Sequence, residues 1–558
     1  MIVADAIASA LVAEGITLAA GLAGTHIGRL MEAIGRREEI ALMYARQERS
    51  AFDMADGYAR ASGKPAVVFT DSGPAAANTM GGLVNSWGDS TPVLFFAGHT
   101  NTTLTAFRDT KEIPFLDLFA PVSKWAAIIQ HPGQLEEILR RAFMQLRSGR
   151  PGPVVIGVPH DIQGMEIGDF HYRPVGPQGR IRPGADPALV DAAVDMIAAA
   201  ERPYLYVGAG VLFSEASSAL VSLAELLTLP AATTLNGKSA FPEDHPLSLG
   251  IGGFIRGRYH TLPAADVAGD ADVILSIGCG FKWEATRKKP ADGVKLIQID
   301  IEPTEINRSQ LADIAIQGDA RLVLEQMIDS ARNRLTPERL TPVVNRIARI
   351  RSLKDRWVSL CEPELTSQAI PINPFRVTHE LCALIDPANT IILHDAGTVR
   401  GTICYHYPAV TPRNFLGFGA QSSMGWSLGA GFGAKKSAPQ KLVIAVIGEE
   451  AFQETAMDIE TSVRNEAPIL VIVKNNRKHM PESSRNDRRI DHARFHRGLD
   501  IGAFVISMGA KTVRIDHPDQ LSAKLAEAIA LVNAGHTTVV DIVTTRANPV
   551  LDRLWAPK

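Results

Sequence analysis

The segment VIGEEAFQETAMDIETSVRNEAPILVIVKNN, residues 446–476, contains two apolar strands joined by one helix. The first strand leads into Glu449 and Glu450, and the second ends at Asn475 and Asn476. Because ligands bind at the carboxyl ends of parallel strands, we expect these two turns at one edge of a sheet. Carboxylate, amide and carbonyl oxygens suit Mg²⁺ or Ca²⁺. The segment therefore predicts a metal site, and its alternative is a capped helix start beside an asparagine turn.

Similar apolar strands alternate with helical patterns along all 558 residues, for example in PAVVFTDSG, GPVVIGVP, ADVILSIG and KLVIAVIG. Continuously apolar strands bounded by Gly or Pro predict parallel sheets covered by helices on both faces. Two stretches that are rich in Gly, Pro or polar residues, 164–187 and 361–374, are typical of linkers. The predicted fold class is α/β, with three doubly wound parallel-sheet domains at residues 1–165, 186–335 and 370–545.

The composition favours a cytoplasmic enzyme. Hydrophobic residues make up 46% and charged residues 21%, which is ordinary for a globular protein, and a net charge of -3 gives no broad basic surface for nucleic acid. The four cysteines are far apart and form no C-x-x-C, which argues against a zinc site or a disulfide framework. We find neither a signal peptide nor an apolar run of about 18 residues that would cross a membrane. We expect a small-molecule substrate and no nucleic-acid or membrane partner.

The two turns are 27 residues apart, counted from Glu449 to Asn476. This spacing resembles the motif of thiamine diphosphate-dependent enzymes, usually Gly-Asp-Gly followed by Asn-Asn. In that family the Asp, the second Asn and a carbonyl two residues further on hold Mg²⁺ against the cofactor's diphosphate. The resemblance implies that Glu449, Asn476 and the carbonyl of Lys478 bind Mg²⁺, with Ca²⁺ as an alternative ion. Other cofactor contacts of this turn would come from Gly448, Glu450 and Ala451.

A second motif lies near the N-terminus, in YARQERSAFDMADGYARASGKPAVVF, residues 44–69. It resembles the glutamate region of the same family, and the resemblance gives Glu48 the role of hydrogen-bonding N1′ of the aminopyrimidine and sharing its proton. DSGPAAANTMGG and GRPGPVVIGVPHDIQ match further family segments, at residues 71–82 and 149–163. The resemblance covers nearly the whole chain in order, and it is greatest to the acetolactate synthase and benzaldehyde lyase branch.

Two more segments resemble cofactor-binding parts of the family. In GFGAQSSMGWSLGAGFGA, residues 417–434, Met424 would be the apolar wedge under the folded cofactor, and the carbonyl of Ser422 would accept the 4′-amino hydrogen. In HDAGTVR, Gly397 and Thr398 resemble the turn that binds the diphosphate at a helix start. The family builds its site between two subunits, so the resemblance implies at least a homodimer, and we expect a homotetramer.

The metal turn departs from the family pattern, because Glu449 replaces Asp and Glu450 replaces Gly. A glutamate is one methylene longer than an aspartate, and Mg²⁺ tolerates poor geometry badly. At about 5 Å from the diphosphate and an effective dielectric of about 20, the Glu450 carboxylate would be repelled by roughly 3 kcal/mol. We therefore expect Glu450 to point away, or to be neutralised by the metal or by Arg477, Lys478 or His479.

The expected substrate side is also unusual. His26 falls near the reaction-centre histidine of benzaldehyde lyase-like enzymes, and the alternative is a loop histidine that only bonds backbone. Lys111 stands where carboligases usually have Gln, and it either favours an anionic substrate or projects to solvent. Glu482 falls where decarboxylase relatives place a proton-relay acid.

The middle unit begins PYLYVGAGVLF, a strand followed by a G-x-G turn without the third glycine of a dinucleotide motif. Relatives use this domain to hold FAD, to hold another nucleotide, or to hold nothing, and we favour the structural role. The resemblance implies a pyrimidine-binding, a central Rossmann-like and a diphosphate-binding domain.

The expected function is that of a thiamine diphosphate- and Mg²⁺-dependent C–C lyase, transferase or carboligase, acetolactate synthase-like, acting on 2-oxo acids or 2-hydroxy ketones. One alternative is a benzaldehyde lyase-like enzyme or a 2-oxo acid decarboxylase. Another is a non-catalytic protein with a degenerate metal motif.

Overall fold

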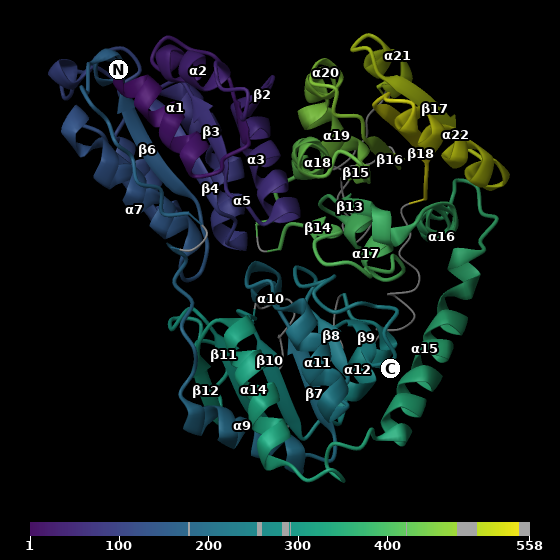
Figure 1. The fold of residues 1–558 in the computed structure, drawn as a ribbon. Helices are drawn as coiled ribbons and strands as arrows, with labels where there is room; N and C mark the ends of the chain where they lie inside the picture. The colour runs from purple at the N-terminus through teal and green to yellow at the C-terminus, as the bar shows by residue number, and fades with distance from the viewer. Residues whose placement is uncertain are drawn as a thin grey trace, which may run out of the picture.

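The structure is a computed structural model that describes residues 1–176, 179–253, 259–281, 290, 292–419, 421–476 and 499–545. Three six-stranded sheets follow one another along the chain, and each lies in its own lobe of the molecule (Figure 1). All neighbouring strands are parallel, which confirms the predicted α/β class with three doubly wound sheets. The sheets span residues 18–159, 203–317 and 390–543. These spans lie inside the three predicted units, and the domain boundaries themselves stay predictions.

The first sheet has the strand order β2-β1-β3-β4-β6-β5. Its strands are β1 (Leu18–Gly21), β2 (Ala41–Tyr44), β3 (Ala66–Thr70), β4 (Val93–His99), β5 (Trp125–Ile128) and β6 (Val154–Pro159). Its helices are α1 (Val3–Ala13), α2 (Gly28–Gly35), α3 (Glu48–Ser62), α4 (Pro74–Asn78), α5 (Met80–Asp89), α6 (Phe115–Phe119), α7 (Leu135–Arg147) and α8 (His160–Gly164). One face of the sheet packs with α1, α2 and α7 into an apolar core of its own.

The second sheet has the order β12-β11-β10-β7-β8-β9 and forms the lower lobe in Figure 1. Its strands are β7 (Pro203–Val207), β8 (Ala231–Thr233), β9 (Ser248–Ile251), β10 (Val273–Ile277), β11 (Lys295–Asp300) and β12 (Ile314–Gln317). Its helices are α9 (Pro187–Ala199), α10 (Gly210–Phe213), α11 (Ser217–Leu227), α12 (Leu262–Gly269) and α14 (Ala320–Arg334). This domain has a separate core, because its apolar side chains cluster mainly with one another.

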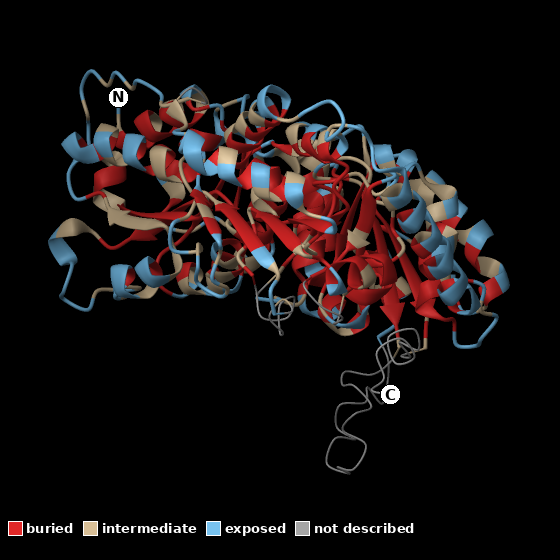
Figure 2. Cartoon of the chain, turned by 90° about the horizontal axis from the view of Figure 1, so that it is seen from below, coloured by how far each residue is buried: buried red, intermediate tan, exposed pale blue. Residues whose placement is uncertain are grey.

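The third sheet has the order β14-β13-β15-β16-β18-β17. Its strands are β13 (Thr390–His394), β14 (Phe415–Gly417), β15 (Leu442–Gly448), β16 (Leu470–Asn475), β17 (Lys511–Ile515) and β18 (Thr538–Val543). Its helices are α16 (Pro374–Leu384), α17 (Thr398–Cys404), α18 (Trp426–Ser437), α19 (Glu449–Thr455), α20 (Ile459–Arg464), α21 (Ile501–Ile506) and α22 (Leu521–Asn533). Apart from the edge strand β17, the strands are almost wholly buried, while the covering helices alternate between buried and exposed residues (Figure 2).

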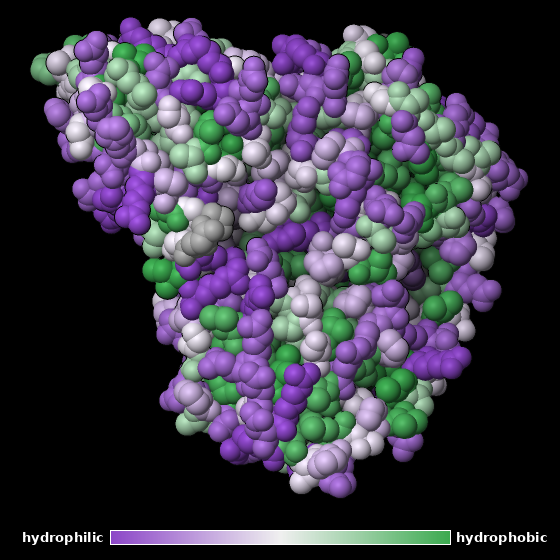
Figure 3. All heavy atoms as spheres, in the orientation of Figure 1, coloured by the Kyte–Doolittle hydropathy of each residue, from purple (hydrophilic) through white to green (hydrophobic). Residues whose placement is uncertain are grey.

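A long helix, α15 (Val344–Leu365), runs between the second and third lobes (Figure 1). It extends into the stretch that the sequence suggested as a linker, even though Pro363 removes a helical hydrogen-bond donor. Trp357, Cys361 and Leu365 are buried in the core of the third domain, and this burial stabilises the last turns of the helix. Within the described residues, no helix combines the length and apolarity needed to cross a bilayer. Hydrophilic side chains cover much of the face in Figure 3.

The first and third domains share one apolar core, and α3 crosses α18 at its centre. The two helices approach closely because glycines replace larger residues at the crossing. A Cβ added to Gly433 would lie 1.8 Å from the carbonyl oxygen of Met54, and one added to Gly57 would lie 2.1 Å from that of Ala430. Both neighbours are backbone atoms, so the helices would have to separate to admit a methyl group.

We expect Gly433→Ala to lower the free energy of unfolding by about 1–3 kcal/mol, which is the usual cost of overpacking a core. Urea unfolding followed by circular dichroism measures the change. Gly269→Ala is the matched control, because nothing lies within 4 Å of a Cβ at this exposed helix end. A Gly433→Ala protein as stable as the control would contradict the close crossing.

Candidate cofactor site

The carboxyl ends of β15 and β16 form one part of the rim of the third sheet. Gly448 pairs in register with Lys474, so the two strands end side by side. The backbone N–H of Asn476 donates a hydrogen bond to Oε2 of Glu449 at 3.3 Å. The two turns that suggested a metal site from the sequence therefore touch each other.

The acidic residues of this rim begin α19. Glu449 is buried, with 4% of its surface exposed, whereas Glu450 is half-buried and Ala451 is buried. Acidic side chains in a first turn are stabilised by the positive end of the helix dipole. The two glutamates therefore favour a helix start at this point, where β15 ends at Gly448 and α19 begins at Glu449.

A second turn of the rim follows β13. Gly397 has a left-handed φ of 78°, and both Gly397 and Thr398, the first residue of α17, are exposed. A Cβ added to Gly397 would meet no atom within 4 Å, whereas one added to Gly448 would lie 3.9 Å from Val399. The rim thus combines the open turn at Gly397 with the turn at Gly448 and Glu449, which we call the Glu449 turn.

The start of α18 joins these turns. The buried carboxylate of Asp395 accepts hydrogen bonds from the backbone N–H groups of Gly425 and Ser427, each at 2.9 Å. A Cβ at Gly425 would lie 2.6 Å from a methyl group of Thr455, so α18 begins in contact with α19. Asp395 was not predicted from the sequence, although an acid directly after an apolar strand was a usable signal.

Met424 and Ser422 lie just before α18. Met424 is half-buried and packs against the core shared by the first and third domains. Its carbonyl oxygen accepts a hydrogen bond from the guanidinium of Arg49 on α3. Ser422 is exposed, has a left-handed φ of 52°, and accepts a hydrogen bond from Arg400 at 2.7 Å. Their predicted contacts with the cofactor stay predictions.

Glu48 begins α3 at the carboxyl edge of the first sheet and is half-buried. Its Oε2 accepts a hydrogen bond from Nδ2 of Asn78 at 3.2 Å. Among the described residues, no hydrogen bond links Glu48 to the third domain. Glu48 is thus bonded within its own domain, whereas Glu449 is bonded to the backbone of Asn476.

One turn further along α3, Asp53 is a buried carboxyl at the crossing with α18. Neither of its oxygens has a hydrogen-bond partner among the described residues, and the Nε of Arg49 lies 3.5 Å from Oδ2. Burial raises the pKa of Asp53 well above its usual value, against the opposing charge of Arg49, and the carboxylates of Asp56, Asp395 and Asp458 raise it further. Asp53 is thus a buried carboxyl whose pKa is raised at the contact between α3 and α18.

We expect Asp53→Asn to stabilise the protein at pH 8. A carboxyl whose pKa is higher in the folded than in the unfolded state binds its proton more tightly in the native protein. Its contribution to the free energy of unfolding is therefore complete below the unfolded pKa and is lost as the pH rises through the folded pKa. The amide cannot ionise, so the variant lacks this loss. Melting temperatures measured from pH 4 to pH 8 should show a difference that grows with pH. A difference that shrinks toward pH 8 would contradict a raised pKa.

His26 and Lys111 meet at the carboxyl edge of the first sheet, where both contact Asp71. The backbone N–H of His26 donates to Oδ1 of Asp71 at 2.8 Å, and Lys111 forms an ion pair with Oδ2. Lys111 therefore does not simply project to solvent, and its partner Asp71 was not predicted from the sequence. Glu482, Lys478, Arg477 and His479 lie outside the described residues.

A cavity of about 560 Å³ lies where the three domains meet. Its floor is the glycine turns after β7 and β10, which are so close that a Cβ on Gly208 would lie 2.0 Å from the oxygen of Gly278. Burial raises the pKa of Asp300, at the end of β11 in the cavity wall, to about 6. Arg400 and Ser422 also line the cavity, so it adjoins the segment before Met424.

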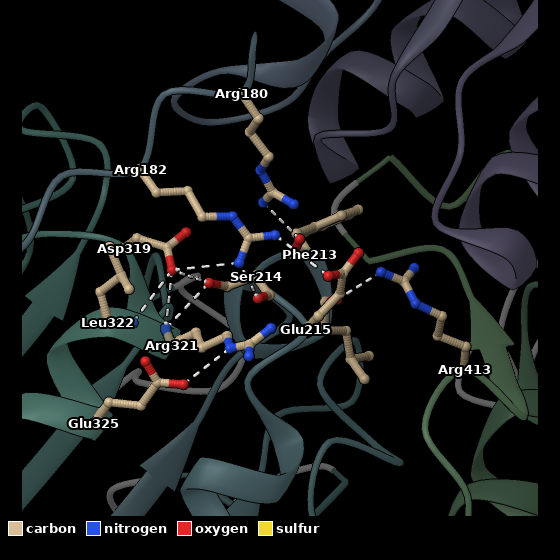
Figure 4. A network of polar contacts seen from close by, with 11 residues as sticks. Arg180, Arg182, Phe213, Ser214, Glu215, Asp319, Arg321, Leu322, Glu325 and Arg413 are labelled. Atoms are coloured by element: carbon tan, nitrogen blue, oxygen red, sulfur yellow. Dashed lines mark hydrogen bonds and ion pairs between the residues drawn. The ribbon is translucent and has the colours of Figure 1, made fainter. Parts of the chain in front are cut away.

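A network of arginines and acids holds one wall of this cavity (Figure 4). Asp319 caps α14 by accepting from two backbone N–H groups and also accepts from Ser214 at 2.6 Å. Arg180 donates to the carbonyl of Phe213 at 2.7 Å, and Arg413 of the third domain donates to that of Leu212 at 2.6 Å. The end of α10 is therefore hydrogen-bonded both to Arg180, which precedes α9, and to Arg413 of the third domain.

Comparison with known families matches all three domains. Residues 1–118 match the thiamine pyrophosphate enzyme N-terminal TPP binding domain, residues 190–327 the central domain, and residues 395–542 the C-terminal TPP binding domain. The chain belongs to the thiamine pyrophosphate enzyme family. It is a thiamine pyrophosphate-dependent enzyme of the acetolactate synthase-like branch, as the sequence analysis predicted.

Individual relatives of this thiamine pyrophosphate enzyme cover almost its full length. The "Probable acetolactate synthase large subunit" of Methanococcus aeolicus is 33% identical, over 94% of this chain and 90% of the relative. The protein of the same name from Methanocaldococcus jannaschii is 33% identical, over 94% and 89%. A solved structure from Mycobacterium smegmatis, described as a thiamin diphosphate-dependent enzyme, has a TM-score of 0.80 and 21% identity, over 98% of this chain and 100% of that one. The last comparison concerns the fold alone.

The residues at the rim of the third sheet fit a divalent ion and a diphosphate. Within the described ranges, no three His, Cys, Asp or Glu side chains gather as a metal site. An ion would therefore depend on Glu449 together with amide and carbonyl oxygens, which is a donor set that Mg²⁺ and Ca²⁺ accept. The open turn at Gly397 leaves room beside them, since a Cβ there would meet nothing.

Proposed function

We propose that this enzyme is a thiamine diphosphate- and magnesium-dependent carboligase or lyase that acts next to the carbonyl of 2-oxo acids or 2-hydroxy ketones, as an acetolactate synthase-like enzyme. The observation that carries the proposal is the contact between Glu449 and the backbone of Asn476 at the rim of the third sheet. The bound cofactor would supply the carbon centre that attacks the substrate carbonyl.

The chain's own residues would hold that cofactor in two places. Glu449, Asn476 and the carbonyl of Lys478 would bind the ion, with Gly397 and Thr398 at the diphosphate. Further contacts would come from Ser422, Met424, Gly448, Glu450 and Ala451. Glu48, whose carboxylate is oriented by Asn78, would hold and exchange a proton at the pyrimidine ring.

We also propose that each site forms between two chains. Glu48 bonds within the first domain, so a partner could bring its Glu48 to the Glu449 turn of this chain. The minimum unit would be a homodimer, and we expect a homotetramer in the cytoplasm. His26 and Glu482 are proposed to act on the reacting groups, and Lys111 to lie at the substrate. We further propose that the three domains extend over residues 1–165, 186–335 and 370–545.

Product analysis tests the proposed reaction. Protein loaded with thiamine diphosphate and Mg²⁺ would be incubated with pyruvate, benzoylformate or an acyloin, and the products followed by NMR. We expect consumption of a 2-oxo acid with formation of a ligated 2-hydroxy ketone or acid. An aldehyde alone would favour decarboxylation, and cleavage of the acyloin alone would favour a benzaldehyde lyase-like reaction. Loaded protein that changes none of them would contradict the proposal.

For the central domain, the cavity supports a nucleotide over the structural role that the sequence favoured. Its volume lies within the usual range for ligand pockets, roughly 300–1,000 Å³, and it lies at the carboxyl ends of β7, β10 and β11. We expect FAD or ADP to raise the melting temperature of the protein by several degrees. If neither ligand shifts it, and the purified protein shows no flavin absorbance, the structural role stands.

A further inference from the structure

Asp71 is a buried carboxylate that binds two candidate substrate-side residues at once. Its Oδ1 accepts from the backbone N–H of His26 at 2.8 Å and lies 3.4 Å from Nδ1 of the His26 ring. Its Oδ2 forms the ion pair with Lys111. The Asp71 side chain is 9% exposed and that of Lys111 is 34% exposed. A single carboxylate thus connects the two residues, which are far apart in sequence.

The backbone around this carboxylate is fixed on both sides. Lys111 has a left-handed φ of 66°, and a Cβ added to Gly73 would lie 2.8 Å from its carbonyl oxygen. The carbonyl of His26 accepts from Nε2 of Gln163 at 2.6 Å, and a Cβ on Gly98 would lie 2.8 Å from the same carbonyl oxygen. Larger residues at either glycine would displace one of the two partners of Asp71.

The charges around Asp71 favour its ionised form. Burial alone would raise the pKa of Asp71, but the hydrogen bonds from Lys111 and from the backbone N–H groups of His26 and Ser72 lower it below its usual value. The ring of His160 lies 5.8 Å from that of His26, and Arg29 and Asp161 are further charged groups beside His160. Lys111 therefore faces a carboxylate rather than an empty pocket.

The same turn leads to the proposed proton-sharing residue. Asp71 follows β3, and seven residues later Asn78, at the end of α4, donates to Glu48. Both Asp71 and Glu48 lie at the carboxyl edge of the first sheet, which has parallel strands. Asp71, His26 and Lys111 are thus placed on the edge that would meet the cofactor and its substrate.

We propose that Asp71 is a positioning residue that orients His26 and neutralises Lys111, so that the first domain offers the substrate fixed hydrogen-bonding groups and no free cation. This inference rests on the proposed function, because it places His26 and Lys111 beside the reacting carbonyl. It implies that Lys111 does not capture the carboxylate of a 2-oxo acid as a free charge. Specificity at this edge would come from the orientation of the two side chains.

The first readout needs no cofactor. Apo protein would be treated with acetic anhydride and the acylation rate of each lysine followed by mass spectrometry. In Asp71→Asn we expect Lys111 to be acylated several-fold faster than in the unmodified protein, because its ammonium group has lost its partner. The exposed Lys64 should react equally in both proteins. Equal rates at Lys111 would overturn the ion pair and with it the proposal.

The second readout is turnover. Asp71→Asn should bind thiamine diphosphate normally and exchange the cofactor's C2 proton at the normal rate, because Glu48 is unchanged, but kcat for a 2-oxo acid should fall at least about tenfold. Asp161→Asn is the matched control, since Asp161 binds Thr102 at the same edge. Unchanged kcat, or a parallel loss of cofactor binding, would overturn the positioning role. Loaded wild-type protein that consumes no 2-oxo acid would instead refute the proposed function, and this inference would fall with it.

Discussion

Glu48→Gln should slow hydrogen–deuterium exchange at C2 of bound thiamine diphosphate by at least about 100-fold, the lower range for loss of a proton-transfer group. A glutamine can accept a hydrogen bond from Asn78, as Glu48 does, but it cannot share a proton with the pyrimidine ring. NMR of acid-quenched samples measures the exchange. Because the proposed diphosphate site is on the third domain, away from Glu48, we expect the dissociation constant of the cofactor to change little.

The matched variant for this experiment is Glu39→Gln, an exposed glutamate of the same domain. It should exchange at the wild-type rate. Normal exchange in Glu48→Gln would remove Glu48 from the proposed role. Loss of cofactor binding in that variant would mean that the carboxylate supports the fold of the site more than its chemistry.

Glu449→Gln should weaken the metal-dependent binding of thiamine diphosphate by at least about 100-fold. Groups that only orient a ligand typically contribute about 10–100-fold to metal affinity, and a direct ligand should contribute more. The amide keeps the size of the side chain and can still accept from the backbone of Asn476, so the turn should persist. Calorimetric titration with the cofactor in Mg²⁺ and in Ca²⁺ measures the loss.

Glu450→Gln is the paired control, and it should act in the opposite direction. If Glu450 lies about 5 Å from the diphosphate, removing its charge should tighten binding by up to roughly 3 kcal/mol. Unchanged affinity would mean that the half-buried Glu450 points away. Equal weakening by both substitutions would contradict a distinct ligand role for Glu449.

Mixing the two inactive variants tests whether the site is shared between chains. After subunit exchange, Glu48→Gln and Glu449→Gln chains would form heterodimers in half of the molecules by random pairing. Each heterodimer would contain one site with both native residues. Once the subunits have fully redistributed, about a quarter of the wild-type rate of C2 hydrogen–deuterium exchange should therefore return. No recovery in a mixture shown to contain heterodimers would place both residues in one chain's own site.

The architecture could be predicted from the sequence because parallel sheets have a strong local signature. Continuously apolar strands ending in glycine or polar turns appear in all three sheets, and the residues after β15 and β16 meet as their spacing suggested. Whether two such turns meet depends on the order of the strands in the sheet, and the repeated strand–helix pattern largely determines that order. The end of α15 was harder to predict. The helix continues past Pro363 because its last turns pack against residues of the third domain that are far away in the sequence.

The polar residues that support the site were not predictable in the same way. Asp395 binds the start of α18 about thirty residues later, and Asp71 connects His26 with Lys111. Nothing in local composition indicates such partners, because they are chosen by the tertiary fold. Asp53 is similar, as its raised pKa comes from burial at the crossing of two domains. A sequence pattern shows that an acid is present but not what it faces.

A crystal structure of the protein with thiamine diphosphate and Mg²⁺ would show directly where the cofactor binds. We expect the ion and diphosphate at Glu449 and Asn476, with N1′ of the pyrimidine in hydrogen-bond contact with Glu48 of a second chain. An empty rim at saturating cofactor, or a Glu48 that faces bulk solvent in every subunit, would contradict this expectation.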